Sequence, residues 1–398
     1  MRAVVGKGGF VKSRIPSPFL KLAGTWALWL LALLFFAYLA MVLNPGQSTV
    51  PVPWNLQNYT LCLFRYDASY YLDIARYGYR DFQRHHPLEK DYLCTAFFPL
   101  YPLLVRAASY PLLGHYRAAA LAVSWACLLL ALFYLHSLAR LYGADNGDQP
   151  YRACLYLLIF PTAVFLALPY SESAFLLTAT GALYHARRAQ WGRSALWACL
   201  ASAARPVGLA AGLACGVEAL RQAGWKPGKL KRGVAFLLLS PLGLALYMAY
   251  LWAAFGNPFI FARAQAEGSG WQRGFNPFAF PQAVWRLFRH PVFTSEFAKY
   301  LYLVVFTTAF ALLTLEVFRR HGPSLGVFSA FCLLAPMITS PPGDPLLSMN
   351  RMVVVIFPAF MVLARGGENR DFERLYLVLG ALGLALFTAL FVYGMWAG

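Results

Sequence analysis

The 398 residues of this chain are 60% hydrophobic and only 13% charged, and the mean hydropathy is +0.53. So little polar surface cannot cover a water-soluble globule of this size, which excludes soluble folds as well as disordered and collagen-like chains. The 34 Lys and Arg outnumber the 16 Asp and Glu. In a membrane protein this excess reports cytoplasmic loops and anionic headgroups rather than nucleic acid. We therefore expect an all-α polytopic membrane protein with a single domain over residues 1–398.

The first apolar run, residues 20–43, is long enough to cross a bilayer, which takes about 20 helical residues. It exceeds the core of a typical signal peptide, so we interpret it as an anchor. Basic residues and no acidic ones precede or begin the run, and the positive-inside rule therefore places the N-terminus in the cytoplasm. These basic residues are Arg2, Lys7, Lys12, Arg14 and Lys21.

Further apolar runs follow, and together with the first they predict about 9–11 transmembrane helices. The stretch 97–113 is interrupted by Pro99, Pro102 and Pro111, so we expect it to be re-entrant or interfacial instead. The apolar runs are 118–140, 151–168, 173–187, 194–218, 234–255, 297–318, 323–340, 351–364 and 375–396.

The run 194–218 lies between basic clusters at 187–193 and 221–232, and both clusters favour the cytoplasm. One crossing cannot satisfy both of them. Pro206, which follows Arg205 near the middle of the run, removes a backbone donor and can break a helix. We therefore predict two short helices that form a re-entrant hairpin. With this hairpin, the segments outside are a first outer loop (44–96), a second outer loop (256–296) and residues 341–350.

Residues 65–79 lie just beyond the first span and combine tyrosines with charges of both signs. In a helix, Asp67, Tyr70 and Tyr71 would share one face. One interpretation is an amphipathic helix that rests on the lipid headgroups, with Asp67 capping its N-terminus. The other is a catalytic helix in which Asp67 is the reactive carboxylate, and the residues alone leave both interpretations open.

Three charged residues fall close to hydrocarbon. Glu172, between two spans, needs a partner or a wet cavity, although the first turn of a helix also suits it. Arg205, inside the hairpin, costs about 2.5–3.5 kcal/mol at membrane depth, and a salt bridge to Glu172 would offset this cost. Arg351 lies at the outer boundary, where it could snorkel to the headgroups. In the second outer loop, Trp271 and Arg273 combine aromatic and cationic groups, as carbohydrate and phosphate sites do.

Motifs that would announce a cofactor are absent from the sequence. It has no GxxxxGK[ST] phosphate-binding loop, no HExxH and no CxxC. The pair His85–His86 is a weak metal candidate, because adjacent histidines project in different directions. We expect that no cofactor is required and leave a divalent metal open. Cys62 and Cys94 could form a disulfide in an oxidising compartment, and residues 58–60 match a glycosylation sequon.

Several blocks within residues 64–365, taken together and in this order, resemble the GPI mannosyltransferase 2 family. This resemblance implies a GT-C membrane glycosyltransferase that uses a polyprenyl-phosphate sugar, commonly mannose, at the outer or lumenal face. The matching blocks are Tyr66–Ala75 with Gly78–Tyr79, Ala96–Pro102, Pro161–Phe165 with Tyr170–Ser173, Arg205 with Gly208, and Arg351 with Phe357–Pro358.

The mechanism that we predict from this resemblance and the topology is an inverting transfer. Asp67 would be the catalytic base and would accept the proton of the acceptor hydroxyl. Arg205 and Arg351 would hold the departing polyprenyl phosphate. Sugar or acceptor binding would fall to Tyr66, Tyr70, Tyr170, Glu172, Trp271 and Arg273.

The acceptor stays open at this point: a lipid, a glycan or a protein. The chain departs from the family pattern at Tyr66, where tryptophan is usual, and at Pro206–Val207, where Ser-Asn often follows the arginine. The usage of Ala, Leu and Arg favours a bacterial plasma membrane, with the endoplasmic reticulum as the place of a eukaryotic chain. The alternative function is a transporter or flippase for a lipid-linked or anionic substrate, which broken helices with charges at membrane depth also fit.

Overall fold

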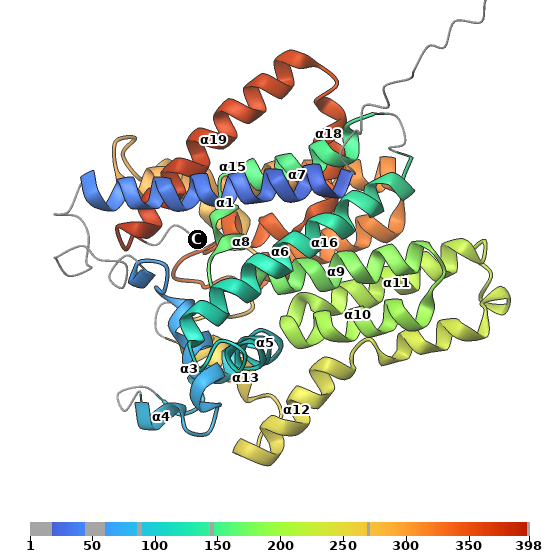
Figure 1. The fold of residues 1–398 in the computed structure, drawn as a ribbon, viewed down its shortest axis with the longest axis horizontal. Helices are drawn as coiled ribbons and strands as arrows, with labels where there is room; N and C mark the ends of the chain where they lie inside the picture. Colours follow the sequence, from blue (N-terminus) through green and yellow to red (C-terminus); the bar gives the residue numbers. More distant parts are fainter. Residues whose placement is uncertain (1–17, 44–59, 86–89, 144–146, 269–270, 396–398) are drawn as a thin grey trace, which may run out of the picture.

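The computed structural model describes residues 18–43, 60–85, 90–143, 147–268 and 271–395. Helices make up the regular structure throughout these residues, and no strand occurs among them. The predicted all-α polytopic fold is confirmed (Figure 1). The basic residues before Pro18, the sequon and His86 lie outside the described residues.

Five helices are long and apolar enough to cross a membrane, or six if one bent pair is a single span. The bent pair, Met349–Val355 and Phe357–Gly366, turns by 79°. This number is smaller than the 9–11 spans predicted, because several expected spans form helices shorter than a crossing. The membrane-length helices are α1 (Pro18–Leu43), α6 (Tyr116–Leu141), η5 with α12 (Arg232–Leu239, Leu242–Phe255), α15 (Ser295–His321) and α19 (Arg370–Val392).

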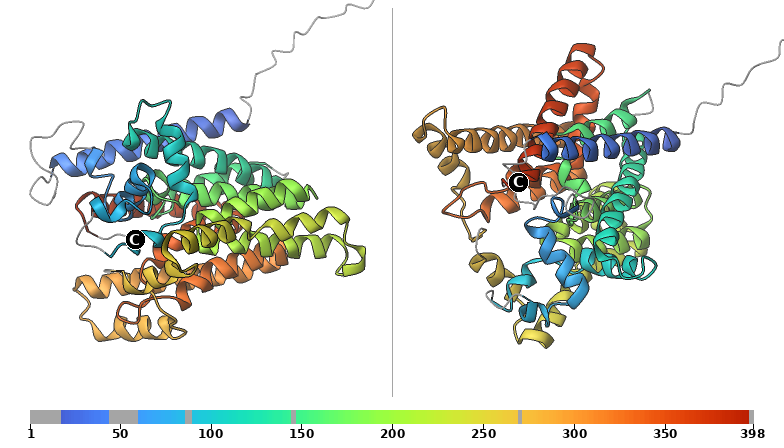
Figure 2. Two further views of the ribbon diagram at one scale, coloured as in Figure 1. Left: turned by 90° about the horizontal axis from the view of Figure 1, so that it is seen from below. Right: turned by 60° about the vertical axis from the view of Figure 1, so that its left-hand side comes forward.

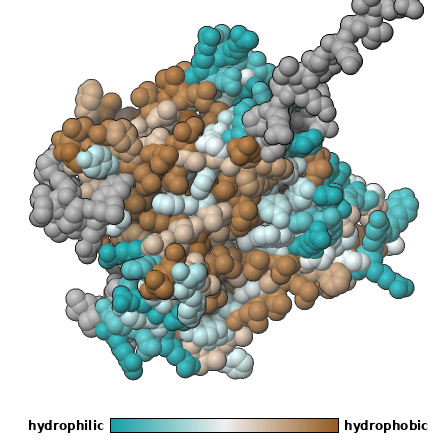
Figure 3. Space-filling model, viewed as in Figure 1, coloured by the Kyte–Doolittle hydropathy of each residue, from teal (hydrophilic) through white to brown (hydrophobic). Residues whose placement is uncertain are grey.

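The long helices expose large apolar side chains, as expected where lipid is the solvent. Leu28 and Leu31 on α1 and Leu382 on α19 are each more than 60% exposed. Hydrophobic side chains cover much of the face in Figure 3, and α1 lies near the upper edge of the molecule in the left-hand view of Figure 2. Together with their length, this exposure makes the chain an integral membrane protein.

The helix α9 (Glu172–Arg187) lies in the interior, and nearly all of its residues are buried. It packs against α6, α10 (Trp191–Ala204) and α11 (Leu209–Gln222). Between α10 and α11, a β-carbon at Gly208 would come 1.9 Å from the carbonyl oxygen of Ala201, so the close turn requires glycine. Gln222 donates to the carbonyl oxygen of Ala186 at 3.0 Å, which places the end of α11 beside the end of α9. The helices α9 and α11 thus run parallel to each other, with α10 antiparallel between them in sequence. The re-entry of α10 and α11 into the membrane stays a prediction.

Short helices from the first outer loop, from the stretch that follows it and from the start of the second outer loop gather at the lower left of Figure 1. There the residues around Asp67 form a helix, α3, and the proline-rich stretch 97–113 forms α5. The elements at this end are α3 (Asp67–Tyr77), α4 (Phe82–His85), η2 (Leu93–Ala96), α5 (Leu100–Ser109) and α13 (Ile260–Glu267). The remaining helices are α7 (Gln149–Ile159), α8 (Val164–Ala167), η3 (Pro206–Gly208), η4 (Pro227–Lys229), α14 (Ala279–Arg289), α16 (Pro323–Ile338), α17 (Met349–Met352), η6 (Val353–Val355) and α18 (Phe357–Gly366).

Candidate active site

Arg351, on the short helix α17, joins two carboxylates from distant parts of the chain. Its Nη1 donates to Oδ2 of Asp67 and its Nε donates to Oε1 of Glu172, both at 2.6 Å. The guanidinium also lies over the ring of Tyr170, 4.4 Å from its centroid. Because the Arg351 side chain is only 3% exposed, these contacts fix its position. Arg351 is therefore paired and does not snorkel to the headgroups.

Glu172 is buried between two arginines. Nη1 of Arg205 lies 2.9 Å from the same Oε1 that Arg351 contacts, so the salt bridge that the sequence allowed is present. Arg205 ends α10 with an extended backbone, and its Nη2 also donates to the sulfur of Met352 at 3.0 Å. A buried carboxylate is costly unless it is paired, and the two guanidinium groups meet this need.

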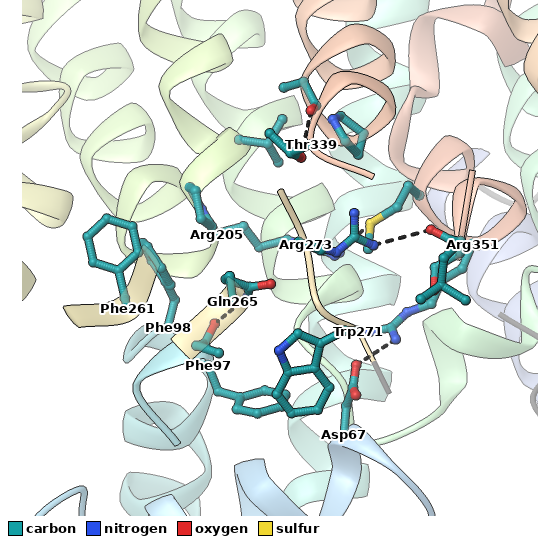
Figure 4. Close-up of a pocket in the computed structure, with 18 of the residues that line it drawn as sticks. Asp67, Phe97, Phe98, Arg205, Phe261, Gln265, Trp271, Arg273, Thr339 and Arg351 are labelled. Carbon is teal, nitrogen blue, oxygen red and sulfur yellow. Dashed lines mark hydrogen bonds and ion pairs between the residues drawn. The ribbon is translucent and has the colours of Figure 1, made fainter. Parts of the chain in front are cut away.

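Asp67 is the first residue of α3 and faces a cavity of about 1000 Å³. Its side chain keeps 22% exposure although Arg351 holds one of its oxygens. Figure 4 shows the carboxylate of Asp67 pointing toward Arg351, with Trp271 beside it and Arg273 between Arg205 and Arg351. The cavity also borders α16, so it extends from a charged end to an apolar wall that includes Phe331.

An aromatic wall stands beside Asp67. Tyr70 stacks on Phe97 with 4.5 Å between ring centroids, and Trp271 meets both rings edge-on at 5.8 Å. The indole of Trp271 donates to the carbonyl oxygen of Ala264 at 3.1 Å, and Gln265 donates to that of Ala96 at 3.2 Å. The first bond fixes Trp271 within the second outer loop, and the second holds that loop against the first.

An ion cluster strengthens the contact between the two outer loops. Glu267, at the end of α13, pairs with Arg263 at 2.6 Å and with Lys90 at 2.5 Å, and Tyr92 also donates to it. These cationic and hydroxyl donors lower the pKa of Glu267 to about 2, with the Arg263 hydrogen bond as the largest cause. The cluster stays charged over the whole physiological pH range and holds the two outer loops together beside the aromatic wall.

Arg273 adds a third guanidinium to the cavity. It donates to the main-chain oxygen of Leu347 at 3.3 Å. Burial, and then the charges of Arg205 and Arg351, lower its pKa to about 10, while Asp67 acts in the opposite direction. Four cationic side chains and two carboxylates line the cavity, so an anion would be favoured there. These six are Arg205, Arg273, Lys299, Arg351, Asp67 and Asp344.

Strained backbone surrounds the same cavity. Tyr66, Gln272 and Ser348 have φ of 54°, 30° and 66°, a region that residues other than glycine seldom adopt. Tyr66 directly precedes Asp67, Gln272 separates Trp271 from Arg273, and Ser348 begins α17. Such strain persists where the surrounding structure fixes it, and it concentrates at functional sites.

The structure places most of the predicted residues on this cavity and two of them behind it. Tyr170 and Glu172 are fully buried and do not line the cavity, so their predicted contact with sugar is not one that this geometry provides. Tyr170 instead donates to the main-chain oxygen of Arg65 at 2.9 Å. Those on the cavity are Tyr66, Asp67, Tyr70, Arg205, Trp271, Arg273 and Arg351.

Sequence reasoning missed the ion pair between Lys299 and Asp344, which also lines the cavity. Each of these residues lies next to an apolar run and looks like an ordinary boundary charge. The signal available was their position: both fall at segment ends that the predicted topology places on the side of Asp67.

Within the described ranges, no group of three or more His, Cys, Asp or Glu residues could hold a metal ion. A need for a divalent metal stays untested.

The cysteines of the first outer loop are thiols in this structure. Cys62 and Cys94 are both fully buried, and the Cys94 sulfur donates to the main-chain oxygens of Asp91 and Tyr79 at 3.5 and 3.6 Å. The disulfide that the sequence allowed is therefore not formed among the described residues.

Comparison with known proteins gives a family match and matches to solved structures. One of the structures is the crystal structure of the Archaeoglobus fulgidus oligosaccharyltransferase in complex with Zn and sulfate, at 12% identity and a TM-score of 0.45. The alignment covers 92% of this chain and 52% of the other, so this chain spans about half the length of that protein. No curated protein matches the chain. The sequence model of the family described as Mannosyltransferase (PIG-V) matches residues 25–224, half of the chain, which therefore belongs to this family.

Proposed function

We propose that this glycosyltransferase moves a mannosyl or related hexosyl residue from a polyprenyl-phosphate donor to a lipid, glycan or protein acceptor. The observation that carries the proposal is the position of Arg351. It links Asp67 to Glu172 at a cavity with more cations than carboxylates. The active site would face the outer or lumenal side, in a bacterial plasma membrane or the endoplasmic reticulum.

In the proposed reaction, Asp67 is the general base. A hydroxyl oxygen of the acceptor attacks the anomeric carbon of the donor and forms the new glycosidic bond, while the hydroxyl proton passes to the Asp67 carboxylate. The bond between the anomeric carbon and the phosphate oxygen breaks, and polyprenyl phosphate leaves with the electron pair. Attack opposite the leaving group inverts the anomeric centre. The partial exposure of Asp67 to the cavity supports this role.

Arg273, together with Arg205 and Arg351, would stabilise the phosphate as its charge grows. The sequence places Arg273 among the sugar-binding residues, but its position beside the other two guanidinium groups supports phosphate binding instead. Its pKa is lowered first by burial and then by the charges of Arg205 and Arg351, and a bound phosphate would offset both effects. Since an anionic leaving group can be stabilised by arginines, the chemistry requires no metal ion.

The two other walls suit the remaining parts of the donor. The aromatic wall of Tyr70, Phe97 and Trp271 presents ring faces and edges to a sugar. The apolar wall at α16, with Phe331, and at Val207 would accept the first prenyl units. A lipid-linked donor could therefore keep its chain in the bilayer while its sugar reaches Asp67.

The direct test uses purified protein in lipid nanodiscs with mannosyl-phosphoryl-polyprenol and a panel of lipid, glycan and peptide acceptors. We expect release of polyprenyl phosphate together with a mannosylated product in wild type and in Asp73→Asn, a matched change on α3 away from the cavity. Asp67→Asn should form both products about 10²–10⁴-fold more slowly. Equal transfer by Asp67→Asn would overturn the base assignment, and donor crossing the bilayer unchanged would favour the flippase alternative.

A further inference from the structure

The helix α14, in the second outer loop, carries an exposed aromatic stripe. Phe278, Trp285 and Phe288 are 66%, 63% and 79% exposed and lie at helical spacing. The opposite side of the helix, with Ala279, Ala283 and Leu287, is buried against the protein. The helix is thus anchored on one face and presents large rings to the surroundings on the other.

Three basic groups accompany this stripe. Arg286 is fixed by its donation to the Tyr300 hydroxyl at 2.8 Å and to the main-chain oxygen of Gly343 at 2.6 Å. Arg289 lies over the Trp285 ring, 5.5 Å from its centroid, and has no carboxylate partner within the described part of the chain. His290 stacks on Tyr300 at 5.9 Å. The nearest carboxylates are Glu296, close to His290, and Asp344, which Lys299 neutralises.

These groups line a second cavity, of about 670 Å³, on the surface of the protein. Its lining residues are Gln282, Trp285, Arg286, Arg289, His290 and Pro342. Pro342 is two residues from Asp344, which lines the large cavity, so the segment 342–344 separates the two cavities.

The depth of α14 in the membrane follows from its neighbour. Only residues 290–294 separate it from α15, a membrane-length helix, so α14 lies at the level where α15 enters the bilayer. Arginine in the hydrocarbon centre is costly, whereas Trp and Arg together are typical of the interface. Both observations favour a position of the exposed stripe at the headgroups.

We propose that α14 is a membrane-surface helix and that its second cavity binds the phosphate of an anionic phospholipid. Arg289 contributes charge, Gln282 and His290 contribute hydrogen bonds, and the rings of Trp285 and Phe288 pack on the glycerol and upper acyl chains. The proposal concerns a lipid bound beside the large cavity and is independent of the reaction there.

The test is native mass spectrometry of the full chain in detergent with equal amounts of phosphatidylglycerol and phosphatidylcholine. Wild type should retain phosphatidylglycerol preferentially. Arg289→Gln should weaken this preference about fivefold, the effect of one basic residue near an anionic surface. Trp285→Ala should weaken the binding of phosphatidylglycerol without removing the charge. Arg374→Gln, the same change at a 76% exposed side chain on α19, should have no effect.

Three results would overturn the proposal. The first is that Arg289→Gln and Trp285→Ala both bind phosphatidylglycerol like wild type. The second is that Arg374→Gln reduces binding as much as Arg289→Gln does, which would make the attraction a property of net charge. The third is that excess inorganic phosphate displaces the lipid, which would assign the cavity to a soluble anion. A thermal denaturation curve like that of wild type in lipid-free detergent checks that each variant is folded.

Discussion

Two buried carboxylates are each held between two arginines, at opposite ends of the bundle formed by α9, α10 and α11. Glu172 begins α9 and pairs with Arg205 and Arg351. Glu218 lies near the end of α11 and pairs with Arg221 at 2.6 Å and with Arg187, at the end of α9, at 3.2 Å. The 16 residues of α9 separate the two clusters by about 24 Å.

The clusters differ in what else their arginines hold. Arg221 makes two hydrogen bonds to Glu218, and Gln222 donates a third, so this carboxylate is fully used in fixing the end of the hairpin. Around Glu172, only Oε1 is used, and Arg351 reaches past it to the partly exposed Asp67. A buried ion pair therefore does not by itself mark a site. The candidate site differs by its cavity, its excess of cations and its second carboxylate.

Replacing Asp67 should give the largest effect. Asp67→Asn keeps the shape of the side chain but removes the base, and we expect transfer to fall about 10²–10⁴-fold. Thermal stability should change little, because Arg351 keeps Glu172 as a partner. The assay is the initial rate of product formation at saturating donor, with Asp73→Asn as the control. A loss of rate that parallels a loss of folded protein would contradict this prediction.

The matched pair Glu172→Gln and Glu218→Gln tests the comparison directly. Removing the charge of Glu172 leaves Arg351 and Arg205 in a buried site with one fewer carboxylate, a change that costs about 3–5 kcal/mol. Removing the charge of Glu218 should lower the free energy of unfolding by less, about 1.5–3 kcal/mol, because Arg187 and Arg221 are 25% and 35% exposed.

Both variants should therefore unfold at lower temperature, as followed by loss of monodispersity on heating in detergent. The activity of the protein that remains folded separates them. Glu218→Gln should transfer sugar at the wild-type rate per folded molecule, and Glu172→Gln should not, because Arg351 would be misplaced. Equal activity of the two variants would mean that both clusters are purely structural.

Arg273 should have a smaller effect, confined to the donor. Arg273→Gln removes one charge-assisted contact to phosphate, worth about 1.5–3 kcal/mol, so kcat/KM for the donor should fall about 10–150-fold. The pKa of Arg273 is about 10, and the charged form exists below it. Wild-type kcat/KM should therefore decline as the pH rises through about 10, while Arg273→Gln should lack this step. The same alkaline step in both enzymes would exclude Arg273 as its source.

Much of the site could be predicted because its parts are local. Asp67 at the start of a helix follows from residues 65–79, and the pairing of Arg205 with Glu172 follows from the cost of each charge in hydrocarbon. The contact between Asp67 and Arg351 bridges 284 residues, and no local pattern contains it. Packing around Tyr170 likewise decides that this ring faces a guanidinium rather than the cavity.

The fold shows the same division. The long spans α1, α6, α15 and α19 lie where hydropathy predicted them. Several other predicted spans form helices shorter than 18 residues, and hydropathy does not distinguish a short crossing helix from one buried among other helices. The helix α9 is such a short helix: its 16 residues are nearly all buried in protein.

The smallest effect, on labelling rather than on activity, concerns the orientation of the two clusters. If the Glu172 end faces outside and the Glu218 end the cytoplasm, a cysteine at exposed Gly228 should react with a membrane-impermeant maleimide only after the membrane is opened. A cysteine at exposed Asn257, in the second outer loop, should react in intact cells. Background labelling should be low, since six of the seven native cysteines are buried. Labelling of position 228 in intact cells would invert the topology, and with it the side from which a lipid-linked sugar reaches Asp67.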